Sequence, residues 1–177
     1  PSVKLHLSAQ EGGFDTRLGG VDAALLLGNA PWPSEWQVHT LVAERIGPVL
    51  SPRHADIERL RQAPAAALLD EPLLHTASRP QAWPHWFAAQ RLDARQLQPG
   101  TGFDHLTYLL EAAAAGLGVA IAPEELVSAD IASGRLLAPW GFVETGGEWA
   151  LCALRGNTDA RIPALADWLR GELNNAD

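Results

Sequence analysis

The sequence predicts an α/β domain with a mostly parallel sheet, and three observations support this prediction. Segments with strand patterns alternate with segments of helical periodicity along most of the 177 residues. The stretches 21–28 and 119–123 are short apolar runs, typical of strands buried on both faces. Hydrophobic residues make up 47% of the chain, which fits a globular domain with a sizeable core.

The first half of the chain begins with a predicted strand at 3–7, where apolar and polar side chains alternate. A short helical turn follows and closes on Gly19 and Gly20. The Pro-rich stretch 29–36 predicts a loop, and 38–52 predicts a long extended segment with a bend at Gly47-Pro48. The remaining expected elements of this half are a helix at 53–62, a strand at 72–76 and a helix at 81–92.

The second half alternates in the same way. We expect Asp104 to cap the helix that spans 104–116. The amphipathic pattern of Ile162, Leu165, Trp168 and Leu169 predicts a terminal helix with one buried face. The expected elements are a short strand or extended loop at 95–100, helices at 104–116, 124–134 and 161–173, and strands at 119–123, 135–140 and 148–154.

The glycines of "GLG", residues 116–118, do not form a dinucleotide-binding motif. That motif requires a strand, then glycines, then a helix whose N-terminus faces the pyrophosphate. Here the helix comes first, so the glycines lie at a helix C-terminus, whose dipole repels anions. We predict a left-handed C-cap at Gly116 and a close backbone approach at Gly118.

No pattern in the sequence indicates catalysis, a metal or a cofactor. Ser51, His54 and Asp56 stand within six positions before a helix, which is typical of turn and cap chemistry rather than of a hydrolytic triad. None of the six histidines has metal-ligand spacing with another His, Cys or acidic residue. The single cysteine, Cys152, lies in an apolar stretch and is expected to be a small buried hydrophobe. We therefore predict no catalytic residue, no metal and no cofactor.

The chain contains seven tryptophans, and a role is predicted for three of them: Trp86, Trp149 and Trp168. Trp83, Trp86 and Phe87 share a helical face, and Trp86 and Trp168 are expected to pack in the core. Trp149 follows a glycine pair at the start of a predicted strand, where it is expected either to pack or to wall a ligand pocket.

Charge and composition limit the classes of partner. The net charge of −8 disfavours binding of nucleic-acid phosphates by these residues. No apolar run reaches bilayer length and no leader pattern is present, so we expect no membrane contact and a cytoplasmic location. The chain starts at Pro1 and contains no methionine, and we expect it to be part of a longer protein.

Seven stretches, in this order and spacing, resemble the effector-binding domain of LysR-type transcriptional regulators, especially the subgroup of the glycine-cleavage activator and the β-lactamase regulator. They are "GGVDAALLLG", "VAERIGPVLSPRH", "EPLLHT", "WPHWFAAQ", "GFDHLTYLLEAAAAGLGVAIAP", "GRLLAPW" and "IPALADWL". The resemblance implies two Rossmann-like lobes of the type 2 periplasmic-binding-protein fold, which the chain crosses twice. Lobe one would hold residues 1–44 and 153–177, and lobe two would hold residues 45–152.

The resemblance also implies a site and partners. An effector would bind between the lobes, at a site lined by Ser8, Ala9, Leu27, Thr101, Phe103, Asp104, His105 and Trp149. The domain would act in a homodimer or homotetramer, and would reach DNA only through an N-terminal winged helix-turn-helix that this chain lacks. RNA polymerase is a further expected partner of the full-length protein.

One position departs from the family pattern. Many relatives carry Arg where this chain has Leu27, and Asp104 is expected nearby. We therefore expect a neutral, amphipathic or cationic effector rather than a dianion. Two alternatives remain to the regulator: a solute-binding protein of a transporter, and an enzyme on the same fold.

Overall fold

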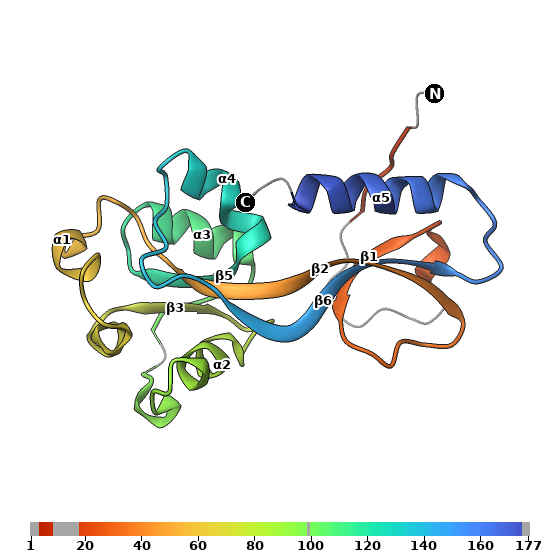
Figure 1. Cartoon of the computed structure of the whole chain (residues 1–177). Coiled ribbons are helices and arrows are strands. Elements are labelled where there is room, and N and C mark those ends of the chain that lie inside the picture. Colours follow the sequence, from red (N-terminus) through yellow and green to blue (C-terminus); the bar gives the residue numbers. More distant parts are fainter. Residues whose placement is uncertain (1–3, 9–17, 99, 175–177) are drawn as a thin grey trace.

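The computed structural model describes residues 4–8, 18–98 and 100–174, and within these ranges six strands form one open sheet. The strands are β1 (Ala24–Gly28), β2 (Trp36–Val49), β3 (Leu73–Thr76), β4 (Gly102–Phe103), β5 (Val119–Pro123) and β6 (Val143–Leu154). Their order is β1-β6-β2-β5-β3-β4. The long strands β2 and β6 run through the middle of the molecule and connect its two ends (Figure 1).

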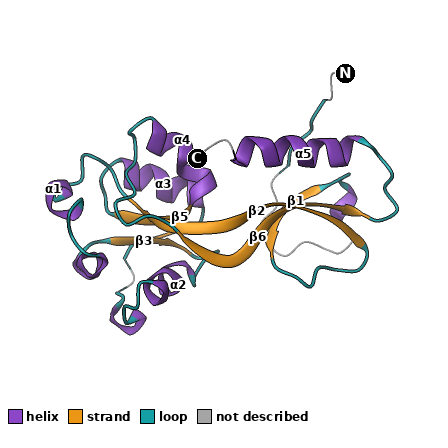
Figure 2. Cartoon of the chain, in the orientation of Figure 1, coloured by secondary structure: helices purple, strands orange, loops and turns teal. Residues whose placement is uncertain are grey.

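Helices cover the sheet from both sides (Figure 2). The α-helices are α1 (Ile57–Leu60), α2 (Ala82–Ala89), α3 (Leu106–Ala114), α4 (Glu124–Ala132) and α5 (Arg161–Asn174), and the 3-10 helices are η1 (Leu18–Gly20), η2 (Ala65–Asp70) and η3 (Ala94–Gln96). In the view of Figure 1, α3 and α4 lie above one end of the sheet and α2 below it, while α5 lies above the other end. No helix among the described residues is long and apolar enough to cross a membrane.

The sheet is mixed, so the prediction of a mostly parallel sheet is wrong. Only β3 pairs in parallel, with β4 on one side and β5 on the other. The pairs β1–β6, β6–β2 and β2–β5 are antiparallel. The strand and helix patterns in the sequence do not encode direction, and the two long strands run opposite to each other through the centre.

The described N-terminal part of the chain is less buried than predicted. β1 forms where the sequence places it, but it is an edge strand, and Leu25 and Leu27 are 51% and 38% exposed. The expected burial on both faces is therefore wrong. Residues 4–8 belong to no strand, and Leu7 is 85% exposed, so the prediction at 3–7 is also wrong for its described part.

Four further predictions need correction. The stretch 135–140 forms no strand, because only Leu137 pairs there, in an isolated bridge to Leu50. Of the short strand or extended loop expected at 95–100, the strand does not form, because Arg95 and Gln96 end the 3-10 helix η3 and no described residue of the segment lies in a strand. The N-cap of α3 is His105, one residue after Asp104. Trp168 is 57% exposed on the outer side of α5, so only Trp86 of the two tryptophans lies in the core.

The two glycines after α3 have the predicted roles. Gly116 has a φ of +88° and its N–H donates to the Ala113 carbonyl at 2.9 Å, which ends the helix. A Cβ on Gly118 would collide with the backbone carbonyl of Pro72 on the segment entering β3. Gly118 therefore permits the close approach that aligns β5 beside β3.

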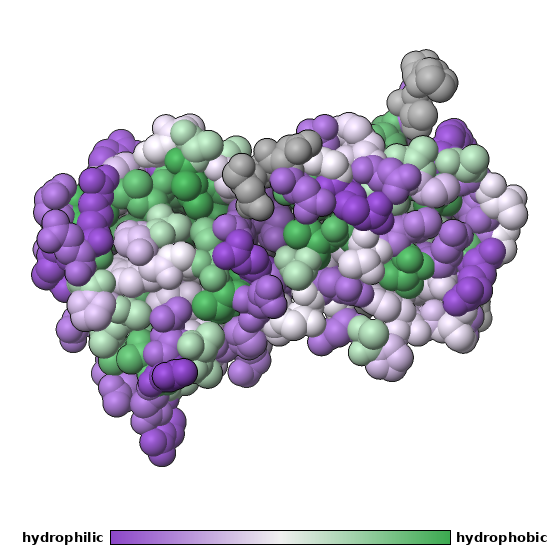
Figure 3. Space-filling model, in the orientation of Figure 1, coloured by the Kyte–Doolittle hydropathy of each residue, from purple (hydrophilic) through white to green (hydrophobic). Residues whose placement is uncertain are grey.

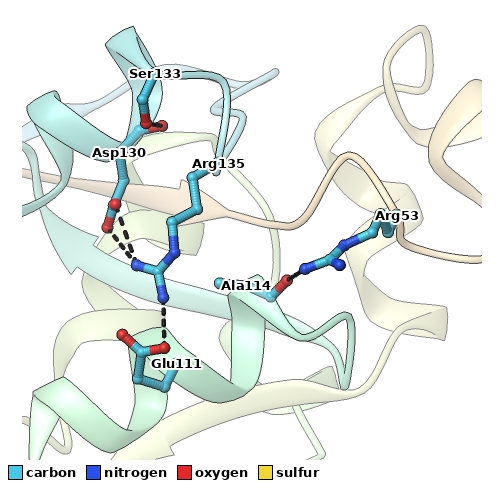
Figure 4. A network of polar contacts seen from close by, with 6 residues as sticks. All are labelled: Arg53, Glu111, Ala114, Asp130, Ser133 and Arg135. Carbon is cyan, nitrogen blue, oxygen red and sulfur yellow. Dashed lines mark hydrogen bonds and ion pairs between the residues drawn. The ribbon is translucent and has the colours of Figure 1, made fainter.

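Ion pairs fasten α3 and α4 to each other (Figure 4). Arg135, in the turn after α4, donates to Asp130 at 3.1 Å and also pairs with Glu111 of α3. Arg53 donates to the Ala114 carbonyl at the end of α3, at 3.3 Å. The Arg53 contact satisfies a carbonyl at the C-terminus of α3, and the Arg135 contacts connect α3 to α4.

Candidate functional site

The carboxyl ends of three parallel strands meet at one edge of the sheet. β3, β4 and β5 end at Thr76, Phe103 and Pro123, and each is followed by a helix: α2, α3 and α4, respectively. In open α/β sheets ligands bind beyond the carboxyl ends of the strands, beside helix N-termini. This edge is therefore the place where the fold can present a site.

The two long strands are irregular where they pass this edge. The register of β2 against β6 changes between the pairs Ala43–Glu148 and Arg45–Glu144. Glu44 of β2 therefore lies opposite a bulge formed by residues 145–147 of β6. Gly146 in this bulge has a φ of +80°. Bulges of this kind redirect side chains and are common beside functional sites. Here the bulge brings the Thr145 hydroxyl to Glu44, to which it donates a hydrogen bond at 2.7 Å.

Glu44 is a buried charge with two partners. Its side chain is 4% exposed, and Arg79 of the β3–α2 loop forms an ion pair with its Oε1 while Thr145 binds its Oε2. A buried carboxylate requires such pairing, because its desolvation would otherwise cost several kcal/mol. The neighbouring Arg45 pairs with Glu124 at the start of α4, at 2.7 Å. Two adjacent residues of β2 thus contact the loop before α2 and the first residue of α4.

A cavity of about 380 Å³ opens around Arg79. Three parts of the chain line it: Leu27 at the carboxyl end of β1, the crossing strands β2 and β6, and the loop and first turn of α2. The lining residues are Leu27, Glu44, Ile46, Ser78, Arg79, Pro80, Gln81, Ala82, His85 and Thr145. Nε2 of His85 lies 2.9 Å from the Glu144 carbonyl and so connects α2 to β6 beside the cavity. The size is suited to a small organic molecule.

A second charged group lies on α4 near β6. Burial raises the pKa of the Glu125 carboxyl, and the carboxylates of Glu124 and Glu44 raise it further. The Trp149 indole on β6 lies near this carboxyl and opposes the shift in pKa, although neither Glu125 Oε2 nor Trp149 Nε1 makes a hydrogen bond to the described residues.

The structure brings only some of the predicted site residues to the cavity. Leu27 lines the cavity and is the cross-strand partner of Trp149, which packs against the core below α5. Phe103 pairs with Thr76 at the end of β3. Of the predicted site residues that the structure describes, only Leu27 lines the cavity.

The other predicted residues lie further from the cavity lining. The Thr101 carbonyl accepts a hydrogen bond from the His75 amide at 3.2 Å. Asp104 and His105 are exposed before α3, and the His105 ring stacks edge-on against Tyr108. Ser8 is exposed and belongs to no strand, and Ala9 lies outside the described residues.

Sequence reasoning missed Glu44, Arg79 and Thr145. The available signal was the pair Glu44-Arg45 inside an otherwise apolar extended segment, because charged residues seldom enter a central strand without partners. The partner Arg79 could not be identified from the sequence, because it lies 35 positions away and is brought near by the pairing of β2 with β5 and of β5 with β3.

The residues whose chemistry could suggest catalysis have structural roles. Ser51 Oγ accepts from the Arg53 amide, and His54 Nδ1 accepts from the Asp56 amide, which confirms the predicted turn chemistry. Cys152 is fully buried, and burial raises the pKa of its thiol to about 11. Among the described residues no group of three or more His, Cys, Asp or Glu side chains is placed to hold a metal ion.

Comparison with known proteins identifies the family. A family model described as the LysR substrate binding domain matches residues 1–174. The chain belongs to this family. It is 58% identical over 173 residues to the HTH-type transcriptional regulator TrpI of Pseudomonas aeruginosa, and 29% identical over 171 residues to the glycine cleavage system transcriptional activator of Escherichia coli. These alignments cover 98% and 96% of the chain but only 59% and 55% of the relatives' lengths.

A solved structure gives the same assignment. The effector domain of the transcriptional regulator AmpR of Pseudomonas aeruginosa matches with a TM-score of 0.76 at 27% identity, over 96% of this chain and 80% of that one. The predicted family and α/β fold class are thereby confirmed: this is a LysR effector-binding domain with a type 2 periplasmic-binding-protein-like fold. The relatives named here are transcriptional regulators, which supports the regulator over the transporter alternative and points to a non-enzymatic protein.

Proposed function

We propose that this LysR domain senses a small-molecule effector in the cavity beside Arg79 and transmits its binding to a DNA-binding part of a longer regulator. The observation that supports this proposal is the composition of the cavity wall. Leu27 comes from β1 at one end of the sheet, and Arg79 comes from the β3–α2 loop at the other end. A ligand that contacts both ends at once can change the angle between them.

The two ends correspond in this proposal to two lobes, residues 1–44 with 153–177 and residues 45–152. The space-filling view shows two bulky ends, with hydrophobic residues gathered in patches between hydrophilic surface (Figure 3). On closure around an effector, the wall would be completed by Thr101, Phe103, Asp104, His105 and Trp149 from the lobe of residues 45–152, and by Ser8 and Ala9 from the other lobe. A differential affinity of about 1–2 kcal/mol for the closed form is enough for a several-fold change in output.

In the full-length protein we place a winged helix-turn-helix before this domain, in a cytoplasmic homodimer or homotetramer that contacts RNA polymerase. Effector binding would alter the packing of subunits and so the spacing of the DNA-binding heads. The net charge of −8 supports the assignment of DNA binding to another part of the protein, because an acidic sensing domain repels the DNA backbone.

A thermal-shift screen of small metabolites of all charge classes tests this function. Binding to the folded state raises the unfolding temperature, by an amount that corresponds to about 2.7 kcal/mol when the ligand is at a hundred times its Kd. We expect at least one compound to produce such a shift, and Leu27→Trp, which places a bulkier side chain in the cavity wall, to abolish it.

Leu25→Trp is the matched control for that variant. Leu25 lies two residues earlier on the same face of β1, is also exposed, and does not line the cavity. The shift should survive in this variant. A screen without hits, or a hit that Leu27→Trp leaves unchanged, contradicts the proposed site.

A further inference from the structure

The crossing strands β2 and β6 are attached to the rest of the protein at each end of the molecule, with an irregular stretch between the attachments (Figure 1). On the side of α5, Arg170 donates to the Thr40 carbonyl of β2 at 2.8 Å. On the side of α4, β2 pairs with β5, and Arg45 forms its ion pair with Glu124. Residues 41–44 of β2 lie between these attachments, so a bend there changes the angle between the two ends.

The bulge at residues 145–147 of β6 lies beside this stretch. The pairing of β6 with β2 stops at Glu144 and resumes at Glu148, and the pairing of β6 with β1 extends only to Glu148. The strand ladder therefore does not hold the bulge. Because bulges bend a strand and increase its local twist, whatever fixes the shape of this bulge also fixes the path of the crossing strands.

One hydroxyl group connects the bulge to β2. Thr145 Oγ1 accepts a hydrogen bond from the Gly147 amide at 3.1 Å and donates one to Glu44 Oε2 at 2.7 Å. The other carboxylate oxygen of Glu44 is bound by Arg79. A continuous series of polar contacts thus runs from Arg79, in the cavity wall, to the backbone of the bulge.

The bulge also adjoins the other end of the molecule. A Cβ on Gly147 would lie 3.4 Å from Cδ1 of Leu27 on β1, and 3.7 Å from Oε2 of Glu44 on β2. Leu27 and Arg79 both line the cavity, and they belong to opposite ends of the sheet. The bulge therefore lies next to one lining residue of each end, directly or through Glu44.

We propose that this bulge is the hinge between the two ends, and that Arg79, Glu44 and Thr145 form a clasp that fixes the hinge angle. Glu44 and Thr145 are then positioning residues, which transmit a movement of Arg79 to the Gly147 amide. This proposal rests on the proposed function, because a ligand in the cavity is what would move Arg79. The clasp itself is present without a ligand, so it can be tested in the ligand-free chain.

The hinge angle is measured by NMR, with residual dipolar couplings that report the orientation of one end relative to the other. Thr145→Val removes the hydroxyl but keeps the shape of the side chain and the pair of Arg79 with Glu44, so no buried charge loses its partner. We expect a changed angle and about tenfold faster hydrogen exchange of the Gly147 amide, which corresponds to one lost hydrogen bond. Thr145→Ser keeps the hydroxyl and should match the wild type in both measurements.

Thr40→Val is the matched control for the threonine variants. Thr40 lies on the same pair of strands and is exposed, and Arg170 binds its carbonyl rather than its hydroxyl. The same substitution at this position should therefore leave both the hinge angle and the exchange of the Gly147 amide as they are in the wild type.

A second pair of variants tests the connection between the cavity and the bulge. Arg79→Lys keeps a positive charge beside Glu44 but replaces the guanidinium, and it should shift the NMR resonance of the Gly147 amide. Arg135→Lys changes another ion-paired arginine, which does not line this cavity, and it should leave that resonance unmoved. These two variants also keep the proposal testable if Thr145→Val does not fold.

The outcomes separate the clasp from the sensing function. An unchanged angle in Thr145→Val, an equal change in Thr40→Val, or a Gly147 amide that does not respond to Arg79→Lys overturns the clasp. If, at the same time, the metabolite screen gives a compound whose thermal shift Leu27→Trp abolishes, the sensing function stands without the clasp. A changed angle in Thr145→Val together with a screen that gives no hit supports the hinge and contradicts the sensing site.

Discussion

Around α2 the sheet is covered by large aromatic side chains, whereas around α5 the buried side chains are aliphatic. Trp83, Trp86 and Phe87 contact one another edge to face, with ring centroids 5.7–6.4 Å apart. Below α5 the buried set is aliphatic: Leu41, Leu151, Ala153, Ile162 and Ala166. The first end combines parallel βα units with an aromatic cluster, and the second combines antiparallel strands with an aliphatic one. Because Arg79 stands on the first end and Leu27 on the second, the cavity joins parts whose cores are built differently.

Tryptophan truncation should show the largest difference between the two ends. Trp86→Ala removes a fully buried side chain beside α2, and we expect a loss of about 3–5 kcal/mol in the free energy of unfolding. Trp168→Ala removes a side chain that is 57% exposed on α5, and should cost less than about 0.5 kcal/mol. Urea unfolding measures the loss of stability in each variant. Similar losses for Trp86→Ala and Trp168→Ala would contradict the predicted difference between the two ends.

Glycine replacement should change sign between the ends. Gly118→Ala places a Cβ against the Pro72 carbonyl and should destabilise by about 1–3 kcal/mol. Gly171 lies inside α5 with no atom within 4 Å of an added Cβ. Gly171→Ala should therefore stabilise by about 0.5–1 kcal/mol, because alanine is the better helix former. The two unfolding temperatures check this prediction, and a shift in the same direction would contradict it.

Cys152 can report whether the end of the sheet that holds β1 opens separately from the rest of the protein. It is buried between β1 and β2, and burial raises the pKa of its thiol to about 11, so labelling at pH 8 requires exposure. We expect an opening free energy at least about 1 kcal/mol below that of global unfolding. Maleimide labelling rates over a urea series give this value. Labelling that occurs only on global unfolding would show that the two ends are one cooperative unit.

Glu125 should give the smallest effect, with a distinct dependence on pH. Because its pKa is raised in the folded state, the folded protein holds this proton longer than the unfolded chain does. Ionisation therefore lowers stability as pH rises above the ordinary value of 4.5, and the cost is complete above the raised pKa. Glu125→Gln should stabilise at pH 7 by about 1 kcal/mol or less, and have no effect at pH 3.

Glu58→Gln, at an exposed position of α1, is the control for that measurement. Thermal unfolding of both variants at pH 3, 5 and 7 separates a specific effect of Glu125 from the loss of one negative charge. Equal shifts in the two variants would assign the stabilisation to net charge alone.

Local pattern was sufficient to place most of the helices and strands. The aromatic spacing in 81–92 predicted the buried face of α2, and the glycines at 116 and 118 predicted how α3 ends and β5 begins. The predictions of burial failed where burial depends on elements that are distant in the sequence. Trp168 has the spacing of a core residue, yet no described element covers it, and 21–28 has the composition of a central strand but forms an edge.

The candidate site was only partly predictable for the same reason. Leu27 was found through a family position, and it lines the cavity. Glu44 and Arg79 have no sequence spacing that connects them, since their contact depends on a bulge in β2 and β6 and on the loop after β3.

The sequence by itself determined most of the element types, the turn chemistry at Ser51 and His54, the end of α3 and, through its ordered motifs, the LysR family. These features depend on backbone preferences and periodicity within a few residues of each other. Only the tertiary structure decided the direction of the strands, the exposure of β1 and α5, and the placing of a held arginine in the cavity. Those features depend on which distant segments pair, because burial and the pairing of a charge are properties of the surroundings rather than of the residue.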